Sequence, residues 1–266
     1  MLLTTCYLLL TTCYLPLHPN RYTLYNDKHM HKHTHEDKVW KMSAEQIASI
    51  QKSSRKLRTS DEEFEEAFKI LKKYPKRVTF FGSARISNRF KAYREAHDLA
   101  AMLAQDGFAI VSGGGGGVME ASNRGAFDEQ HVSIGFNIVL PKEQHLNPYT
   151  TSSLAFNYFF TRKVMMTFYS HGFIFFPGGF GTFDEFFEVI TIIQTGKMAP
   201  VPIILVGKKF WNPLDRYIKR HMLKNGLISK GDRKLYHITN DLNYARKIIN
   251  EQYEHNKTRI ENSFIK

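Results

Sequence analysis

Short apolar runs alternate with amphipathic segments over most of the chain. The apolar runs are nearly continuous, as in strands whose two faces are both covered by helices. They fall at residues 78–83, 108–112, 132–140, 172–176 and 201–206. Segments with helical spacing lie between them, at residues 91–105, 118–128, 156–170 and 183–194. This alternation predicts an α/β fold, a Rossmann-like three-layer domain with a mostly parallel sheet.

The same patterns divide the chain into four parts. Residues 77–255 hold the alternating pattern of the predicted domain. Residues 1–41 contain a direct repeat of LLTTCYL and a polar tract, and we expect a disordered or mis-annotated N-terminal extension there. Residues 42–76 form a predicted N-terminal helical segment, in which Ser60-x-x-Glu63 has the form of a helix start. Residues 256–266 are predicted to be a basic C-terminal tail.

Net charge narrows the choice of partners. The chain carries a formal net charge of +12, which favours anionic partners such as phosphorylated metabolites, nucleic acid or an acidic surface. After residue 206, fourteen Lys/Arg stand against six Asp/Glu, but no RNA-recognition signature or zinc finger is present there. We interpret this surplus as a solvated basic face, with nucleic acid an unlikely partner.

Cysteine and histidine usage argues against several kinds of site. The two cysteines, Cys6 and Cys13, both precede the predicted domain, which excludes a disulfide framework, a cysteine zinc site and a cysteine nucleophile, and fits the cytoplasm. Alternating histidines at residues 29–35 lack a scaffold that would fix metal geometry, so no metal site is predicted. The LLTTCYL repeat is too short and polar for a membrane helix, and no membrane association is predicted.

Three strand-to-helix corners have unusual chemistry: FGSAR at residues 81–85, SGGGGGVME at 112–120 and PGGFGTFDE at 177–185. Glycine permits positive φ and close approach to a ligand, while a helix N-terminus offers unpaired N–H groups and partial positive charge. Amides from Gly179 to Thr182, with the Thr182 hydroxyl, are therefore predicted to seat a phosphate. The Walker A and G-x-G-x-x-G patterns are absent, which favours a mononucleotide over NAD, and no bound cofactor is predicted.

Glu185 has two interpretations from sequence. Thr182-x-x-Glu185 fits a capping box, in which Glu185 would bond back to the amide of Thr182. The same carboxylate could instead act in catalysis beside the phosphate seat. The pattern alone favours neither.

The motifs SGGGGGVMEASNRGA, TRKVMM and PGGFGTFDE, together with FGSAR and LPKEQHLNPY, resemble those of the Lonely Guy (LOG) family, often mislabelled "lysine decarboxylase". The resemblance runs from about Val78 to about Asp241. It implies hydrolysis of the N-glycosidic bond of an AMP-like or cytokinin nucleoside 5′-monophosphate to free base and ribose 5-phosphate, by a homodimer or higher homo-oligomer. Arg162 and Glu185 match the family's catalytic pair. The matching substrate- and phosphate-binding positions are Ser83, Gly114, Gly115, Glu143, Lys163, Gly178, Gly179, Gly181, Thr182 and Thr191.

The chemistry explains these residue types. Breaking a ribosyl C–N bond passes through an oxocarbenium-like state, which a carboxylate such as Glu185 stabilises while orienting or deprotonating water. Arg162 offers a planar, permanently charged fork that can clamp phosphate or ribose oxygens. Phe160 stands where the family commonly has His and Phe180 where it often has Tyr, so the preferred base stays open.

Three other functions compete with hydrolysis. A non-catalytic nucleotide or phosphorylated-cofactor carrier would bind the ligand without releasing base. A pyridoxal-phosphate decarboxylase would need a Schiff-base lysine, and no S-x-H-K-type site is found. A nucleic-acid module would show salt-sensitive binding that does not depend on Glu185.

Overall fold

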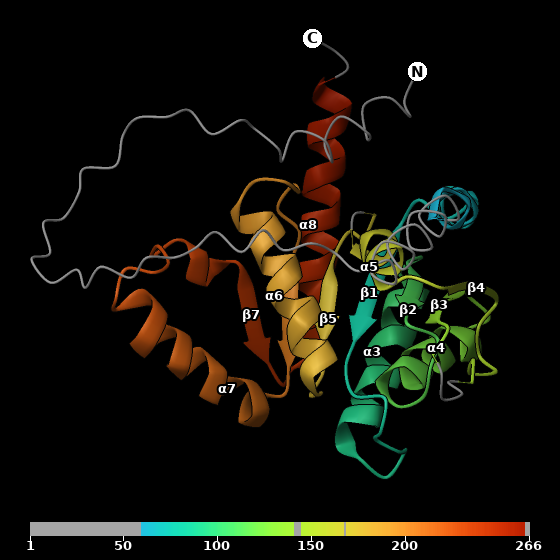
Figure 1. Cartoon of the computed structure of the whole chain (residues 1–266), viewed down its shortest axis with the longest axis horizontal. Helices are drawn as coiled ribbons and strands as arrows, with labels where there is room; N and C mark the ends of the chain where they lie inside the picture. Colours follow the sequence, from blue (N-terminus) through green and yellow to red (C-terminus); the bar gives the residue numbers. More distant parts are fainter. Residues whose placement is uncertain (1–59, 141–144, 168, 264–266) are drawn as a thin grey trace, which may run out of the picture. The chain divides into compact units, whose positions relative to one another are not determined.

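A seven-stranded, all-parallel sheet organises the computed structural model, which describes residues 60–140, 145–167 and 169–263. The strand order is β4-β3-β2-β1-β5-β6-β7, with β4 and β7 at opposite edges (Figure 1). The strands are β1 (Arg77–Phe81), β2 (Ala109–Ser112), β3 (Ser133–Ile138), β4 (Ser152–Phe156), β5 (Phe173–Phe175), β6 (Ile203–Val206) and β7 (Tyr236–Thr239). The predicted Rossmann-like α/β fold is confirmed.

Helices cover both faces of the sheet. The helices are α3 (Lys91–Gln105), α4 (Val118–Asp128), α5 (Phe159–Thr167), α6 (Phe180–Gln194), α7 (Lys208–Tyr217) and α8 (Leu242–Ser263), and α7 continues into a π-helical turn at Ile218–Leu223. Alternate residues of β5 show the layering, because Phe173 and Phe175 pack with residues of α5, α6 and α7, whereas Ile174 packs with residues of α3, α4 and α8. Within the described residues, no helix combines the length and apolar character that crossing a membrane requires.

The element predictions differ from the structure mainly at the sheet edges. All five predicted strands are present, but edge strands β4 and β7 were missed because they are partly polar and partly exposed. The helix predicted at 156–170 is wrong at its start, since residue 156 ends β4 and α5 begins at Phe159. The helix predicted from residue 183 begins at Phe180.

The predicted end regions fare differently. No element ends at the boundary predicted after residue 255, because α8 continues to Ser263. The N-terminal extension at 1–41, and the helical segment up to residue 59, lie outside the described residues. The described remainder of that segment is helical over residues 60–72.

The chain order creates a switch point between β1 and β5. From β1 the chain builds outward through β2, β3 and β4, and it then returns to place β5 on the other side of β1. Ligands of open parallel sheets bind where the strand order reverses, beyond the carboxyl ends of the strands. The FGSAR and PGGFGT corners meet there, since the Ser83 amide donates to the Pro177 carbonyl at 3.1 Å. Val118, at the start of α4, donates to the Ser83 carbonyl at 2.9 Å, which joins the third corner.

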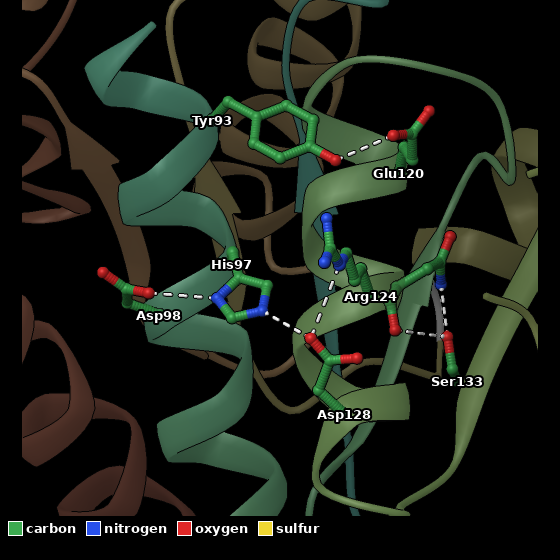
Figure 2. Close-up of polar contacts among 8 residues, drawn as sticks. Tyr93, His97, Asp98, Glu120, Arg124, Asp128 and Ser133 are labelled. Carbon is green, nitrogen blue, oxygen red and sulfur yellow. Dashed lines mark hydrogen bonds and ion pairs between the residues drawn. The ribbon is translucent and has the colours of Figure 1, made fainter. Parts of the chain in front are cut away.

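A cluster of polar side chains links α3 to α4 (Figure 2). We call it the polar clasp, and it consists of Tyr93, His97, Asp98, Glu120, Arg124 and Asp128. His97 on α3 lies 3.0 Å from both Asp98 and, across the helix pair, Asp128 of α4. Arg124 approaches Asp128 at 3.5 Å, and the Tyr93 hydroxyl donates to Glu120 at 2.7 Å. Because α4 follows the glycine-rich corner directly, the clasp holds that corner's helix in place.

We expect the clasp to stabilise the fold more in mild acid than in base. Burial by itself lowers the pKa of His97, but the bonds to Asp128 and Asp98 outweigh it and leave that pKa raised. A raised pKa in the fold adds stability below the unfolded pKa of 6.5, and this stability is lost as pH rises through the folded value. His97→Ala should therefore cost about 1 kcal/mol of unfolding free energy at pH 5.5 and less at pH 9.

Urea unfolding at the two pH values checks this expectation. His255→Ala, at an exposed position of α8, serves as the matched control and should change little at either pH. An equal loss for His97→Ala at pH 5.5 and pH 9 would contradict the assignment of the clasp to a charged histidine.

Candidate active site

The PGGFGT corner ends in an open helix N-terminus. Gly179 is the N-cap of α6, and the amide of Phe183 makes the first helical bond, to the Gly179 carbonyl at 3.2 Å. The amides of the first helical residues, Phe180 to Thr182, therefore have no acceptor within the helix and carry the positive end of its dipole. A β-carbon built at Gly179 or Gly181 would meet no atom within 4 Å. Packing does not require glycine there, and residues 179–181 are exposed.

The two glycine corners use glycine differently. Gly114 and Gly117 have positive φ, of 69° and 66°. The glycines of PGGFGT are absent from the positive-φ residues of the described chain. Gly178 serves close packing instead, because a β-carbon there would lie 2.1 Å from Thr182 Oγ1 and 2.9 Å from the Ser83 nitrogen.

The structure excludes one of the two interpretations of Glu185. Thr182 is not the N-cap, because α6 begins two residues before it and its N-cap, Gly179, makes no side-chain cap bond. The capping-box interpretation is therefore wrong. Glu185 faces α5 instead, with its Oε1 3.8 Å from Nη1 of Arg162. Only 17% of its side chain is exposed.

Arg162 is fixed by strand β3 and by the glycine-rich corner. Its side chain is 9% exposed, and its Nε donates to the Phe136 carbonyl at 2.7 Å. A β-carbon at Gly113 would lie 2.2 Å from Nη2, so the guanidinium lies directly against that glycine. The Arg162 guanidinium is thereby held beside Glu185 at the switch point, where its Nη groups can bind an anionic or polar ligand.

The environment of Glu185 perturbs its protonation. Burial raises the pKa of Glu185 to about 7, an effect that Arg162 opposes and Asp184 reinforces. Perturbed carboxyl groups of this kind cluster at functional sites. With a pKa near neutrality, Glu185 can take up a proton and release it under the conditions in which a cell operates.

Lys163 links α5 to α6 by ion pairs next to Arg162 and Glu185. Its Nζ lies 2.9 Å from both Asp184 and Glu188, which flank Glu185 on α6. The side chains of Arg162 and Lys163 both reach acidic residues of α6. The acidic partners of Lys163 were missed, since their role depends on how two helices pack.

A buried polar network shapes the glycine-rich corner. The Gly114 amide donates to Ser112 Oγ at 3.0 Å, and that hydroxyl donates to Asn123 Oδ1 at 2.6 Å. Asn147 donates to the Gly115 carbonyl at 3.0 Å and to Asn123 Oδ1 at 2.9 Å. Sequence reasoning missed this network, although Asn123 is a polar residue within an otherwise small-residue helix face.

Other predicted site residues lie in different places. Ser83 lies in the FGSAR corner that follows β1, where its Oγ accepts a hydrogen bond from the Arg85 amide at 3.1 Å. Thr191 lies apart from the Arg162–Glu185 pair, since its hydroxyl donates to the Phe187 carbonyl within α6 and it borders a separate pocket of about 80 Å³. Glu143 lies outside the described residues.

The larger cavity does not suit a phosphate. It encloses about 530 Å³ and is lined by Glu62, Glu63, Glu66, Val139, Leu154, Asn157 and Tyr158. Three carboxyl groups on its wall would repel a phosphate dianion. The switch point is the better candidate, because it combines the helix N-terminus of α6 with the guanidinium of Arg162.

Fold and site together define a Rossmann-like α/β protein with a helix N-terminus at its switch point and a buried arginine–glutamate pair. The family described as "Possible lysine decarboxylase" matches residues 119–249. A probable cytokinin riboside 5′-monophosphate phosphoribohydrolase of Oryza sativa subsp. japonica is 31% identical over 167 residues, 60% of this chain and 76% of the relative. The chain belongs to this family, the LOG family.

Two further similarities agree. A cytokinin riboside 5′-monophosphate phosphoribohydrolase of Rhodococcoides fascians is 28% identical over 177 residues, which is 64% of this chain and 87% of the relative. The crystal structure of TM1055 is 22% identical, with a TM-score of 0.51, and the match covers 66% of this chain and 99% of that one. At that identity, the structural similarity supports the fold alone.

Proposed function

We propose that this protein hydrolyses the N-glycosidic bond of nucleoside 5′-monophosphates, giving free base and ribose 5-phosphate. Family membership and the activity in the names of the relatives from Rhodococcoides fascians and Oryza sativa support this proposal. The observation that carries it is the Glu185 carboxyl group, 3.8 Å from the buried guanidinium of Arg162 and one turn from the open N-terminus of α6.

The parts have complementary roles in this proposal. The amides of Phe180, Gly181 and Thr182 bind the 5′-phosphate, favoured by the helix dipole. Glu185 follows Thr182 by three residues, a rise of roughly 4.5 Å along the helix, so a ribose held by its phosphate can extend toward the carboxylate. Arg162 clamps ligand oxygens and orients the sugar.

Glu185 supplies the chemistry at the anomeric carbon. As the C–N bond breaks, positive charge develops on the ribose, and the ionised carboxylate stabilises it. The same carboxylate takes a proton from the attacking water, whose oxygen forms the new bond to C1′. The base departs with the electron pair of the broken bond and takes up a proton from solvent, while Glu185 returns the proton of the attacking water to solvent, so that the protons balance.

A base-release assay tests the proposal. The full chain is incubated with AMP, GMP, CMP, UMP and a cytokinin riboside 5′-monophosphate, and free base and ribose 5-phosphate are measured by chromatography. Adenosine is the matched control, and it should react far more slowly because it lacks the phosphate. No release above that of Glu185→Gln would overturn the proposal, and tight nucleotide binding without release would support the carrier alternative.

The pH profile gives a second expected outcome. Because a general base must be ionised, kcat/KM should rise with pH through about 7, the pKa to which burial brings Glu185, and then level off. Steady-state rates between pH 5.5 and 9 measure this limb. A profile that is flat across that range, with the protein folded throughout, would argue against Glu185 as the base.

A further inference from the structure

One buried carboxyl group has no part in the chemistry described so far. Glu63 lies on the helix over residues 60–72, outside the family match, and is 7% exposed. Its Oε1 accepts from the Asn157 amide at 2.7 Å and from Asn157 Nδ2 at 3.0 Å. Its Oε2 accepts from the Thr161 hydroxyl at 2.5 Å. Burying a carboxylate is costly unless it is hydrogen-bonded, and these three bonds provide the compensation.

All of these partners lie at the start of α5. Asn157 directly follows the last residue of β4, and Thr161 is in the first turn of α5. A helix N-terminus also carries a partial positive charge, which a nearby carboxylate stabilises. Glu63 thus anchors the start of α5 from a different segment of the chain, through Asn157 and the Thr161 hydroxyl.

The next residue after Thr161 is Arg162. Its guanidinium lies between the Phe136 carbonyl, at 2.7 Å from Nε, and Glu185, at 3.8 Å from Nη1. Because the first turn of α5 sets the direction of the Arg162 side chain, a shift of that turn moves the guanidinium. A misplacement of about 1 Å at a reacting site can cost on the order of 100-fold in rate.

We propose that Glu63 is a positioning residue for Arg162: the carboxylate fixes the first turn of α5 and thereby directs the guanidinium at Glu185. Its effect on turnover rests on the proposed hydrolysis, whereas its effect on the Arg162–Glu185 geometry does not.

The helix over residues 60–72 has other anchors, so altering Glu63 does not detach it. Phe64 and Phe160 have ring centroids 6.4 Å apart, and those of Phe68 and Tyr169 are 5.1 Å apart. Arg77 donates to the Leu71 carbonyl at 2.8 Å. A change at Glu63 therefore tests the bonds to Asn157 and Thr161 rather than the docking of the whole helix.

The experiment compares Glu63→Ala, Glu63→Gln and the control Glu65→Gln, which changes an exposed position of the same helix, in the full chain. It measures kcat and KM for AMP and follows the Glu185 carboxyl by carbon NMR titration. Glu63→Ala should lower kcat about 10- to 100-fold with a smaller change in KM. Glu63→Gln should restore most of the rate, because its amide oxygen can accept from Asn157 and its NH₂ can donate to Thr161.

The titration reports the geometry directly. Arg162 and Lys163 lower the pKa of Glu185, whereas burial, Asp184 and Glu188 raise it. If Glu63→Ala moves Arg162 away, the midpoint of Glu185 shifts to higher pH, which a general loss of stability would not produce. The same shift is expected for Thr161→Val, which removes the hydroxyl that donates to Glu63, so the test does not depend on Glu63→Ala folding.

An unchanged Glu185 midpoint in Glu63→Ala, or in Thr161→Val should Glu63→Ala not fold, overturns the positioning role. A shifted midpoint supports it even if the wild-type protein releases no base, in which case only the proposed hydrolysis fails.

Discussion

Glu185→Gln is expected to abolish most nucleotide hydrolysis while leaving the protein folded. The amide cannot accept a proton from water or offset positive charge on the ribose, so kcat should fall by about 10²- to 10⁴-fold. Glutamine has nearly the same shape as glutamate, and α6 keeps its N-cap at Gly179. Free-base release from AMP at pH 8 measures the loss.

The same substitution is expected to stabilise the fold at pH 8. The pKa of Glu185 is raised from 4.5 to about 7, so the unfolded chain binds fewer protons than the folded protein between these values, and stability falls as pH rises. Above pH 7 the folded protein bears the full cost of holding a buried anion. Glutamine does not ionise, and the unfolding free energy should rise on the order of 1–3 kcal/mol at pH 8.

Thermal melting at pH 5 and pH 8 separates this gain from a general effect, since the gain should nearly vanish at pH 5. Glu251→Gln, an exposed position on α8 that pairs with Lys247, is the matched control and should change neither rate nor stability appreciably. Retained turnover in Glu185→Gln would remove the catalytic assignment, and a lower melting temperature at pH 8 would contradict the buried, strained carboxylate.

The central sheet could be predicted from sequence because its strands are buried on both sides. Residues of β1 and β2 are buried without exception, and such continuous apolar runs stand out. The strand β4 shows partial exposure at alternating positions. Only two residues separate it from α5, so the hydrophobic pattern does not mark where the strand ends and the helix begins. The hydrophobic pattern of an edge strand is weaker because no strand lies along one of its two edges.

The site was only partly predictable for a different reason. The motif T-x-x-E fits a capping box wherever it falls, and sequence does not fix whether α6 starts at Phe180 or at residue 183. In the structure α6 starts at Phe180 with Gly179 as its N-cap, and the Thr182 hydroxyl packs against Gly178. The partner of Glu185, at 3.8 Å on another helix, follows from tertiary packing alone.

Removing the guanidinium should impair the same site by a separate route. Arg162→Ala deletes the clamp on the ligand, leaves the buried Phe136 carbonyl without the donor it has at 2.7 Å, and takes away the positive charge that lowers the pKa of Glu185. We expect kcat/KM to fall about 10²- to 10³-fold. The acid limb of the pH profile should move above 7, and unfolding should become easier by about 1–3 kcal/mol.

Gly113→Ala displaces the guanidinium without deleting it. The added β-carbon would lie 2.2 Å from Arg162 Nη2 and 2.6 Å from Met119 Sδ, the far ends of two flexible side chains that can shift. Rates should therefore fall toward those of Arg162→Ala with a smaller loss of stability. Arg216→Ala, exposed on α7, is the matched control. If AMP hydrolysis and its pH profile survive both site variants, then Arg162 does not orient the ligand, and the pairing with Glu185 serves only to hold α5 against α6.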